Sequence, residues 1–146
     1  MFRGQFRHNL DDKGRLILPA KFRDKIGEGA VITIGFEKCI TIYPEQEWEK
    51  LQKSLVSMPV ANKMVRSLSR VINGNASDVE IDKQGRVKIP DYLLDNANIT
   101  KECCIVGVNT TIEIWDAATW LNIENEGKES FEENAEKLSS FLMGME

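Results

Sequence analysis

Short runs in which apolar and polar residues alternate predict β-strands in two separate parts of the chain. Each part has an early strand that leads into an Asp-x-x-Gly turn, a second strand that ends at a proline, and two later strands that form a hairpin. The expected strands cover residues 5–10, 16–18, 30–35 and 39–43 in the first part and residues 77–81, 87–89, 102–107 and 111–115 in the second. The order of expected strands is therefore the same in both parts.

Helices are expected between and after these strands. A short helix follows Pro19 over residues 20–25, and another follows Pro90 over residues 91–96, because proline suits the first turn of a helix. Longer amphipathic helices are expected to begin after Pro44, to cover residues 60–72 up to Asn73-Gly74-Asn75, to begin after Asp116, and to cover residues 130–143. Each part therefore reads β, β, short α, β, β, followed by longer helices.

The last of these helices has apolar residues on one face and glutamates on the other. Phe131, Ala135, Leu138 and Leu142 recur at helical spacing. We expect this face to point inward and to dock on the body of the protein.

The two parts are copies of one unit. Residues 10–19 match residues 81–90 at a constant offset of 71, with Asp, Gly, Arg and Pro at the same spacing. After one inserted residue the match continues, with residues 35–43 on residues 107–115 and Trp48 on Trp120. Two unrelated strand-turn-strand units would explain the turn residues, but not the shared Arg, Pro and Trp. We therefore interpret the chain as an internal duplication.

The duplication predicts an α+β protein made of two tandem modules. The expected segments are a first module at 5–47, a helical connector at 48–75, a second module at 76–119 and an acidic helical segment at 120–146. One such module is too short to bury a large core alone, so we also expect the protein to be an oligomer.

Charge is distributed unevenly along the chain. The formal net charge is −4, which alone argues against a nucleic-acid partner. Residues 1–25, however, carry seven Lys or Arg against three Asp, whereas residues 124–146 carry seven Glu against two Lys. A basic front combined with an acidic tail lets one face attract phosphate while the whole protein stays soluble.

Candidate chemistry for catalysis or metal binding is sparse. The chain has three cysteines, two of them adjacent, and one histidine, with no Cys-x-x-Cys spacing for zinc. We expect reduced, buried thiols, no metal, no cofactor, no small-molecule substrate and no enzymatic activity. No long apolar run predicts a membrane span or a signal peptide, so we expect a cytoplasmic protein.

Two motifs carry a resemblance to a known family. Asp11 to Arg15 and Asp82 to Arg86 each lie inside a Gly-Arg-hydrophobic-x-hydrophobic-Pro frame, which resembles the AbrB swapped-hairpin superfamily. Their duplication, with His8 to Arg15 near the start and Glu113-Ile114-Trp115 closing the second unit, resembles the MraZ family. The resemblance covers nearly the whole chain.

The resemblance implies a fold and a function. Hairpins from the two modules would interlock into a pseudo-twofold β-barrel, and copies of the chain would assemble into a ring. The ring would bind double-stranded DNA at short repeated boxes upstream of a cell-division and cell-wall gene cluster. The protein would act there as a nucleoid-associated transcriptional regulator.

The turn residues are the candidate DNA contacts. Arg15 and Arg86 could hold a phosphate or the O6/N7 edge of guanine. Alternatively, each arginine could pair with the aspartate of its own motif, Asp11 or Asp82, and fix the turn; the two roles are compatible. Lys13 and Lys83 would contact phosphates.

Two further DNA-facing positions are implied by the resemblance alone. In AbrB-like modules, basic residues three before the Asp and eight after the Arg face DNA. These positions are His8 and Arg23 in the first repeat, but Val79 and Leu94 in the second. We therefore predict that the first repeat dominates DNA binding.

An antitoxin-like or architectural role is the alternative function. Antitoxins of this fold bind DNA through the swapped hairpins and neutralise a toxin through an added tail. The acidic helix over residues 130–143 could be such a tail.

Overall fold

The computed structural model describes residues 1–144 and confirms the predicted order of elements in both repeats. The first repeat contains β1 (Gln5–Asn9), β2 (Arg15–Ile17), α1 (Ala20–Ile26), β3 (Val31–Ile34), a short 3-10 turn (Phe36–Lys38) and β4 (Ile40–Tyr43). The second contains β5 (Ser77–Asp78), β6 (Arg86–Lys88), α4 (Asp91–Asn96), β7 (Glu102–Val108) and β8 (Thr111–Asp116). The longer helices are α2 (Glu45–Ser57), α3 (Lys63–Gly74), α5 (Ala117–Glu129) and α6 (Phe131–Gly144).

Two boundaries differ from the prediction by three residues. Strand β5 ends at Asp78 instead of residue 81. Its partner β3 begins at Val31, and the preceding loop turns away through Gly27 and Gly29, which both have positive φ. Helix α3 begins at Lys63 rather than residue 60, because the Asn62 side chain caps it by accepting hydrogen bonds from the first helical N–H groups.

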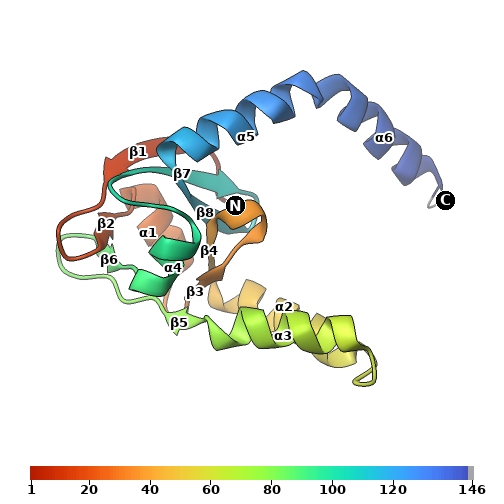
Figure 1. Cartoon of the computed structure of the whole chain (residues 1–146), viewed down its shortest axis with the longest axis horizontal. Coiled ribbons are helices and arrows are strands. Elements are labelled where there is room, and N and C mark those ends of the chain that lie inside the picture. Colours follow the sequence, from red (N-terminus) through yellow and green to blue (C-terminus); the bar gives the residue numbers. More distant parts are fainter. Residues whose placement is uncertain (145–146) are drawn as a thin grey trace. The chain divides into compact units, whose positions relative to one another are not determined.

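The strands exchange partners between the repeats. The larger sheet has the order β1-β7-β8-β4-β3-β5, so the first strand of each repeat pairs with the hairpin of the other repeat. Strands β2 and β6 form a separate antiparallel pair, which we call the β2–β6 ribbon. Figure 1 shows the two turns of this ribbon together at one end of the sheets. The swapped arrangement is thus present within one chain.

The expected barrel is not confirmed. The described strands are hydrogen-bonded in two sheets, and neither sheet closes on itself. Strands β1 and β5 remain the outer strands of the larger sheet because each pairs with only one neighbour.

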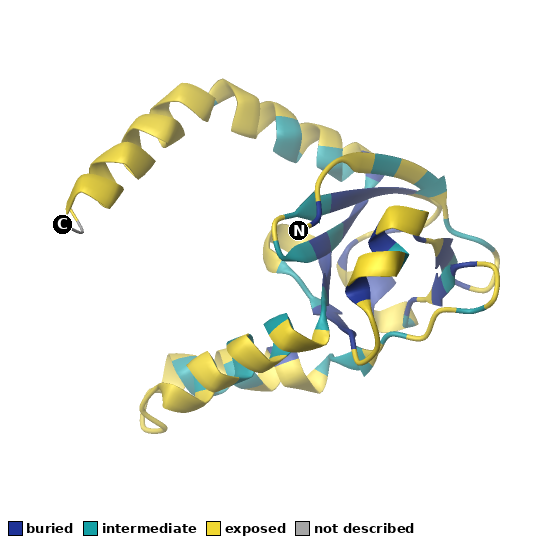
Figure 2. Cartoon of the chain, turned by 180° about the vertical axis from the view of Figure 1, so that it is seen from behind, coloured by how far each residue is buried: buried dark blue, intermediate teal, exposed yellow. Residues whose placement is uncertain are grey.

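Both repeats bury their matching apolar residues in one core. Leu16 and Val87 face each other across the ribbon, and both are fully buried. Phe22 from α1 and Leu93 from α4 join the same cluster. Figure 2 shows this buried interior under exposed helices and loops. Residues 1–116 therefore form one compact unit that contains both repeats, and the described residues 117–144 belong to a second one.

Helices α2 and α3 form a hairpin that projects from the strands of the first unit (Figure 1). The hairpin is attached at its base, where the Thr33 hydroxyl on β3 donates to the carbonyl of Ile72 at 2.7 Å. Ile72 is the buried residue of α3. Much of the remaining surface of α3 faces solvent.

The second unit consists of α5 and α6. Helix α6 buries none of its residues, and Phe131, Leu138 and Leu142 are 69%, 57% and 54% exposed. The expectation that this face docks on the body of the protein stays a prediction. The apolar face exists as predicted, and within residues 117–144 helix α5 does not cover it.

The shared core generates a stability prediction. We expect Leu16→Ala to lower the free energy of unfolding by about 2–5 kcal/mol, because it removes a fully buried side chain at the junction of the repeats. Urea unfolding of residues 1–116 within the full chain should remain a single transition.

Ile17→Ala is the matched control for that experiment. Ile17 is adjacent in β2 but 42% exposed, so its truncation should change the free energy of unfolding by about 0.5 kcal/mol or less. Two separate urea transitions, one for each repeat, would contradict a shared core.

Candidate nucleic-acid interface

The first turn is held by the carboxylate of Asp11. One of its oxygens accepts hydrogen bonds from the backbone N–H of Lys13 and of Arg15, both at 2.9 Å. The other accepts from Nε of Arg15 at 2.7 Å. Gly14 has a φ of +74°, a conformation that suits glycine and closes the turn. Asp11 therefore fixes both the backbone of the turn and the direction of the arginine.

The second turn repeats this geometry at the matching residues. The Asp82 carboxylate accepts from the backbone N–H of Arg86 at 2.9 Å and from Nε of Arg86 at 2.7 Å. Gly85 has a φ of +80°. The ion pair between aspartate and arginine, which the sequence left open as an alternative, is thus present in both turns. Only Nε of each guanidinium donates a hydrogen bond to the aspartate of its own turn.

The two turns lie against each other. Gly85 accepts a backbone hydrogen bond from Leu18 at 3.1 Å, and Gly14 accepts one from Ile89 at 2.9 Å. Nη1 of Arg86 also lies 3.8 Å from the carboxylate of Asp11. The two motifs, 71 residues apart in sequence, thus form one site.

The outer face of the β2–β6 ribbon is basic. Because side chains alternate along a strand, Leu16 and Val87 point into the core, and their neighbours point outward. Arg15 pairs with Lys88 across the ribbon, and Ile17 pairs with Arg86. Three of the four outward residues therefore carry positive charge.

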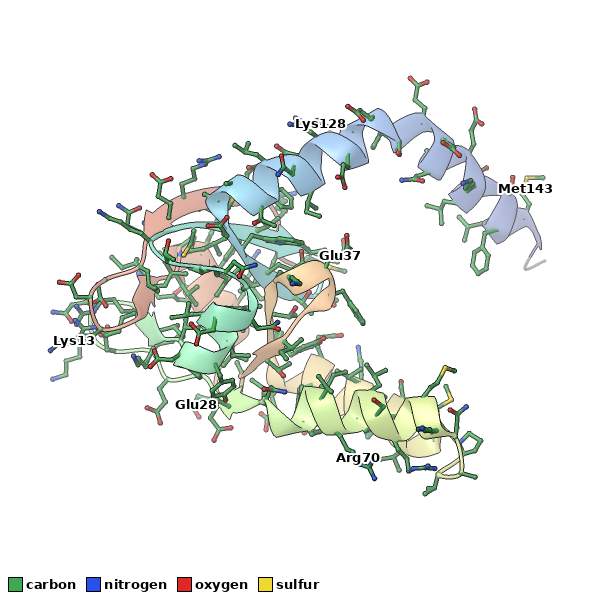
Figure 3. The ribbon with its side chains drawn as sticks, viewed as in Figure 1. Lys13, Glu28, Glu37, Arg70, Lys128 and Met143 are labelled. Atoms are coloured by element: carbon green, nitrogen blue, oxygen red, sulfur yellow. The ribbon has the colours of Figure 1, made fainter. Side chains whose placement is uncertain are left out.

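The turn lysines extend this basic face. Lys13 and Lys83 are both exposed, each in the turn of its own repeat. Figure 3 shows the Lys13 side chain pointing away from the protein at the tip of the first turn. We call Lys13, Arg15, Lys83, Arg86 and Lys88 the ribbon cations.

Lys88 was not predicted from the sequence. Its partner position in the first repeat is Ile17, so comparison of the repeats gave no signal for a cation. The signal lay in the alternation of Arg86, Val87 and Lys88, which places both cations on one side of β6. The Lys88 ammonium also donates a hydrogen bond to the carbonyl of Lys13 in the other turn.

Arg23 lies at the second turn, not the first. It follows Arg15 in sequence, and we grouped it with the first repeat for that reason. Its guanidinium donates to the carbonyl of Leu18 at 2.7 Å and lies so close to Gly85 that a side chain there would clash with it. The matching Leu94 packs near Gly14 in the same way. The side chain that lies beside each turn therefore comes from the other repeat: Arg23 beside Gly85, and Leu94 beside Gly14.

His8 lies on β1, outside the ribbon. It pairs with Cys103 of β7 in the larger sheet and is half-buried. The alternation of β1 places His8 on the same side as Phe6, which packs against the core, while Arg7 is exposed on the other side. Among the residues of β1, Arg7 is thus the more accessible cation.

The turn carboxylates are more acidic than ordinary aspartates. Desolvation raises the pKa of Asp11, but hydrogen bonds from the backbone and side chain of Arg15 outweigh it and lower the pKa below 3.8. For Asp82, the hydrogen bond from the backbone N–H of Arg86 is the largest influence and lowers the pKa, and the Arg86 side chain adds to it. Both carboxylates therefore stay charged near neutral pH.

The cysteines are buried and form no disulfide within residues 1–144, as predicted. Burial raises the pKa of the Cys39 and Cys103 thiols to about 12, so both stay protonated. Within the same residues, no group of three or more His, Cys, Asp or Glu is placed to hold a metal ion. None of the described helices is both long and apolar enough to cross a membrane.

Comparison with known proteins supports the duplication. The family model described as "MraZ protein, putative antitoxin-like" matches the chain twice, over residues 1–71 and 72–142. The chain belongs to the MraZ family. It is 46% identical over 138 residues to the "Transcriptional regulator MraZ" of Lactobacillus gasseri, an alignment that covers 94% of this chain and 96% of that protein.

The two MraZ matches also relate the long helices to each other. The first match extends through α2 into α3, and the second extends through α5 into α6. Helices α2 and α5 have 13 residues each, and both contain the matched tryptophan, Trp48 or Trp120. Helices α3 and α6 therefore occupy corresponding places in the two MraZ repeats.

The lowered carboxylate pKa predicts a pH dependence of stability. The folded state binds a proton at Asp82 less readily than the unfolded chain does, so the ion pair stabilises the fold above pH 3.8. This contribution is lost as the pH falls through the lower pKa of the folded state. We expect Asp82→Asn to destabilise the protein near pH 7, with a difference from wild type that shrinks toward about pH 3.

Urea unfolding at several pH values measures this difference. Asp12→Asn, at an exposed aspartate in the first turn, is the control and should change stability little at any pH. A cost of Asp82→Asn that does not vary with pH would mean that the charge of the carboxylate is not what holds the turn.

Proposed function

We propose that this MraZ-family protein is a sequence-specific DNA-binding transcriptional regulator. The observation that carries the proposal is the basic outer face of the β2–β6 ribbon, formed by arginines that aspartates hold in fixed directions. The name of the Lactobacillus gasseri relative supports regulation of transcription. A two-stranded ribbon fits the major groove of DNA, where sequence is read.

The two arginines have different roles in this proposal. Arg15 uses Nε for Asp11, which leaves its terminal nitrogens for the O6 and N7 atoms of a guanine. Arg86 additionally donates from Nη2 to Gln84 and lies near Asp11 through Nη1. Arg86 is thus more engaged within the protein, so Arg15 contributes more to base recognition.

The remaining cations contact the DNA backbone. Lys13 and Lys83 at the turn tips and Lys88 on β6 bind phosphates, which adds affinity without sequence preference. Arg23 provides positive charge at the second turn. Because cations of both repeats meet in one site, the repeats act together rather than the first dominating alone.

One ribbon reads few base pairs. Its strands have three residues each, or about 10 Å, which is the rise of about three base pairs. We therefore propose that several copies of the chain assemble as a ring on short repeated boxes upstream of a cell-division and cell-wall gene cluster. Binding at several boxes raises the effective concentration of each further contact. The protein would work in the cytoplasm at the nucleoid, without a cofactor.

An antitoxin-like role is the second candidate, because α6 has an exposed apolar face with glutamates beside it. In that role a toxin would cover α6 while the ribbon still binds DNA. Arginine variants of the ribbon separate the two activities, since they would affect DNA binding alone.

The proposal predicts the behaviour of the ribbon arginines. Wild type should prefer a fluorescent duplex with several direct repeats of a guanine-containing box over a scrambled duplex. Arg15→Ala should weaken binding to the repeats by about 1–3 kcal/mol and remove the preference, because a fork onto guanine is lost. Arg86→Ala should have a smaller effect on the preference. Binding titrations at two salt concentrations measure both.

The ribbon lysine should behave differently. We expect Lys88→Ala to weaken binding to repeated and scrambled duplexes equally and to lower the slope of log affinity against log salt by about 1, because one phosphate contact is lost. Lys53→Ala, at an exposed lysine of α2, is the charge-matched control and should leave both slopes unchanged. Equal binding of all duplexes by wild type would show that base sequence is not read.

A further inference from the structure

Helix α3 exposes apolar residues that no other element of residues 1–116 covers. Met64, Leu68 and Val71 lie along one side of the helix, line a shallow groove with Lys63, and are all exposed. Exposed apolar stripes of this kind on an amphipathic helix are typical of an interaction surface. We call Met64, Leu68 and Val71 the α3 stripe.

A second groove lies on another side of α3. It is lined by residues of α2, α3 and the loop between them, including the exposed Val56 of α2 and Met58 and Val60 of the loop. Arg66 and Arg70 from α3 also line it. Figure 3 shows Arg70 on the outside of the helical hairpin. The grooves of the hairpin are therefore apolar and bordered by cations.

Helix α6 has the complementary character. Phe131, Leu138 and Leu142 lie along one side of it and are exposed. Glu132 and Glu136 lie on the adjacent side of the same helix. We call Phe131, Leu138 and Leu142 the α6 stripe.

The charges of the two helices are opposite. Helix α3 carries three basic residues and no acidic residue, whereas α6 carries three glutamates and one lysine. Their lengths also match, because 12 and 14 residues correspond to about 18 and 21 Å of helix. The two helices therefore carry apolar stripes of similar length, and the charges beside the stripes have opposite signs.

We propose that the α6 stripe of one chain packs on the α3 stripe of a second copy of the same chain. This inference deepens the self-assembly in the proposed function and identifies its surface. Burial of the two stripes drives the contact, and the opposite charges set which helix pairs with which. A pairing of α3 with α3 or of α6 with α6 is disfavoured by like charges.

The pairing has a consequence for the form of the assembly. Since α3 and α6 are different surfaces, each contact leaves one free α3 at one end and one free α6 at the other. Such head-to-tail contacts close a ring when the rotation between neighbouring copies adds up to a full turn, and they form an open filament when it does not. The internal duplication supplies both halves of the contact, because α3 and α6 descend from corresponding places in the two repeats.

Charge reversal tests the pairing in the full chain without DNA. The first variant combines Lys63→Glu with Arg70→Glu, and the second combines Glu132→Lys with Glu136→Lys. All four residues are exposed, so the fold should tolerate the changes. Light scattering with size-exclusion chromatography should find that each variant alone assembles at roughly hundredfold higher concentration than wild type.

A mixture of the two variants tests whether α3 of one chain pairs with α6 of another. An equimolar mixture should recover assemblies of wild-type size, because each reversed α3 meets a reversed α6 on the other variant. Lys53→Glu with Lys101→Glu reverses two exposed cations outside α3 and should assemble as wild type does. Recovery in the mixture also shows that both variants are folded.

Three results would overturn the proposal. They are a wild type that stays monomeric at all concentrations, variants that assemble normally, and a mixture that does not recover. The last result is expected if α6 binds within its own chain or binds another protein. The experiment contains no DNA, so a protein that assembles this way but ignores repeated boxes would contradict the proposed function and leave this contact standing.

Discussion

The antiparallel pairing of β2 with β6 joins the two repeats where both the core and the basic face begin. Each strand has three residues, so one buried residue per strand, Leu16 or Val87, anchors the pair. The same alternation that buries these residues turns Arg15, Arg86 and Lys88 outward. The short loops on either side then bring both turns together, so that one contact between repeats sets the stability and the position of the candidate site.

Duplication with divergence explains how a nearly symmetric backbone carries an asymmetric surface. The two Asp-x-x-x-Arg turns keep the same hydrogen bonds, because those bonds hold the backbone of each turn. Positions that only project from the fold have diverged: Ile17 corresponds to Lys88, and basic α3 corresponds to acidic α6. The two repeats thus share the geometry of their turns but differ in the charge of their long helices.

The elements and the hairpin of each repeat could be predicted from the sequence pattern, whereas the pairing of strands between the repeats was implied only by the family resemblance. Alternation, prolines and turn glycines are local signals, and they fixed the order of strands and helices. The neighbour of Arg23 depends on which repeat supplies the facing turn, so its position in the sequence did not reveal that it lies beside Gly85. Lys88 was missed because its matching residue is apolar. The apolar face of α6 was recognised, but periodicity does not reveal what covers a face.

The central claim is that DNA is bound at the β2–β6 ribbon. Hydrogen exchange of the full protein, with and without a duplex of repeated boxes, tests it most directly because it locates the contact without a substitution. The account predicts that exchange slows mainly in peptides covering residues 11–18 and 82–90. Slowing confined to α3 or α6, with the ribbon unchanged, would contradict it and place the DNA contact on the helices.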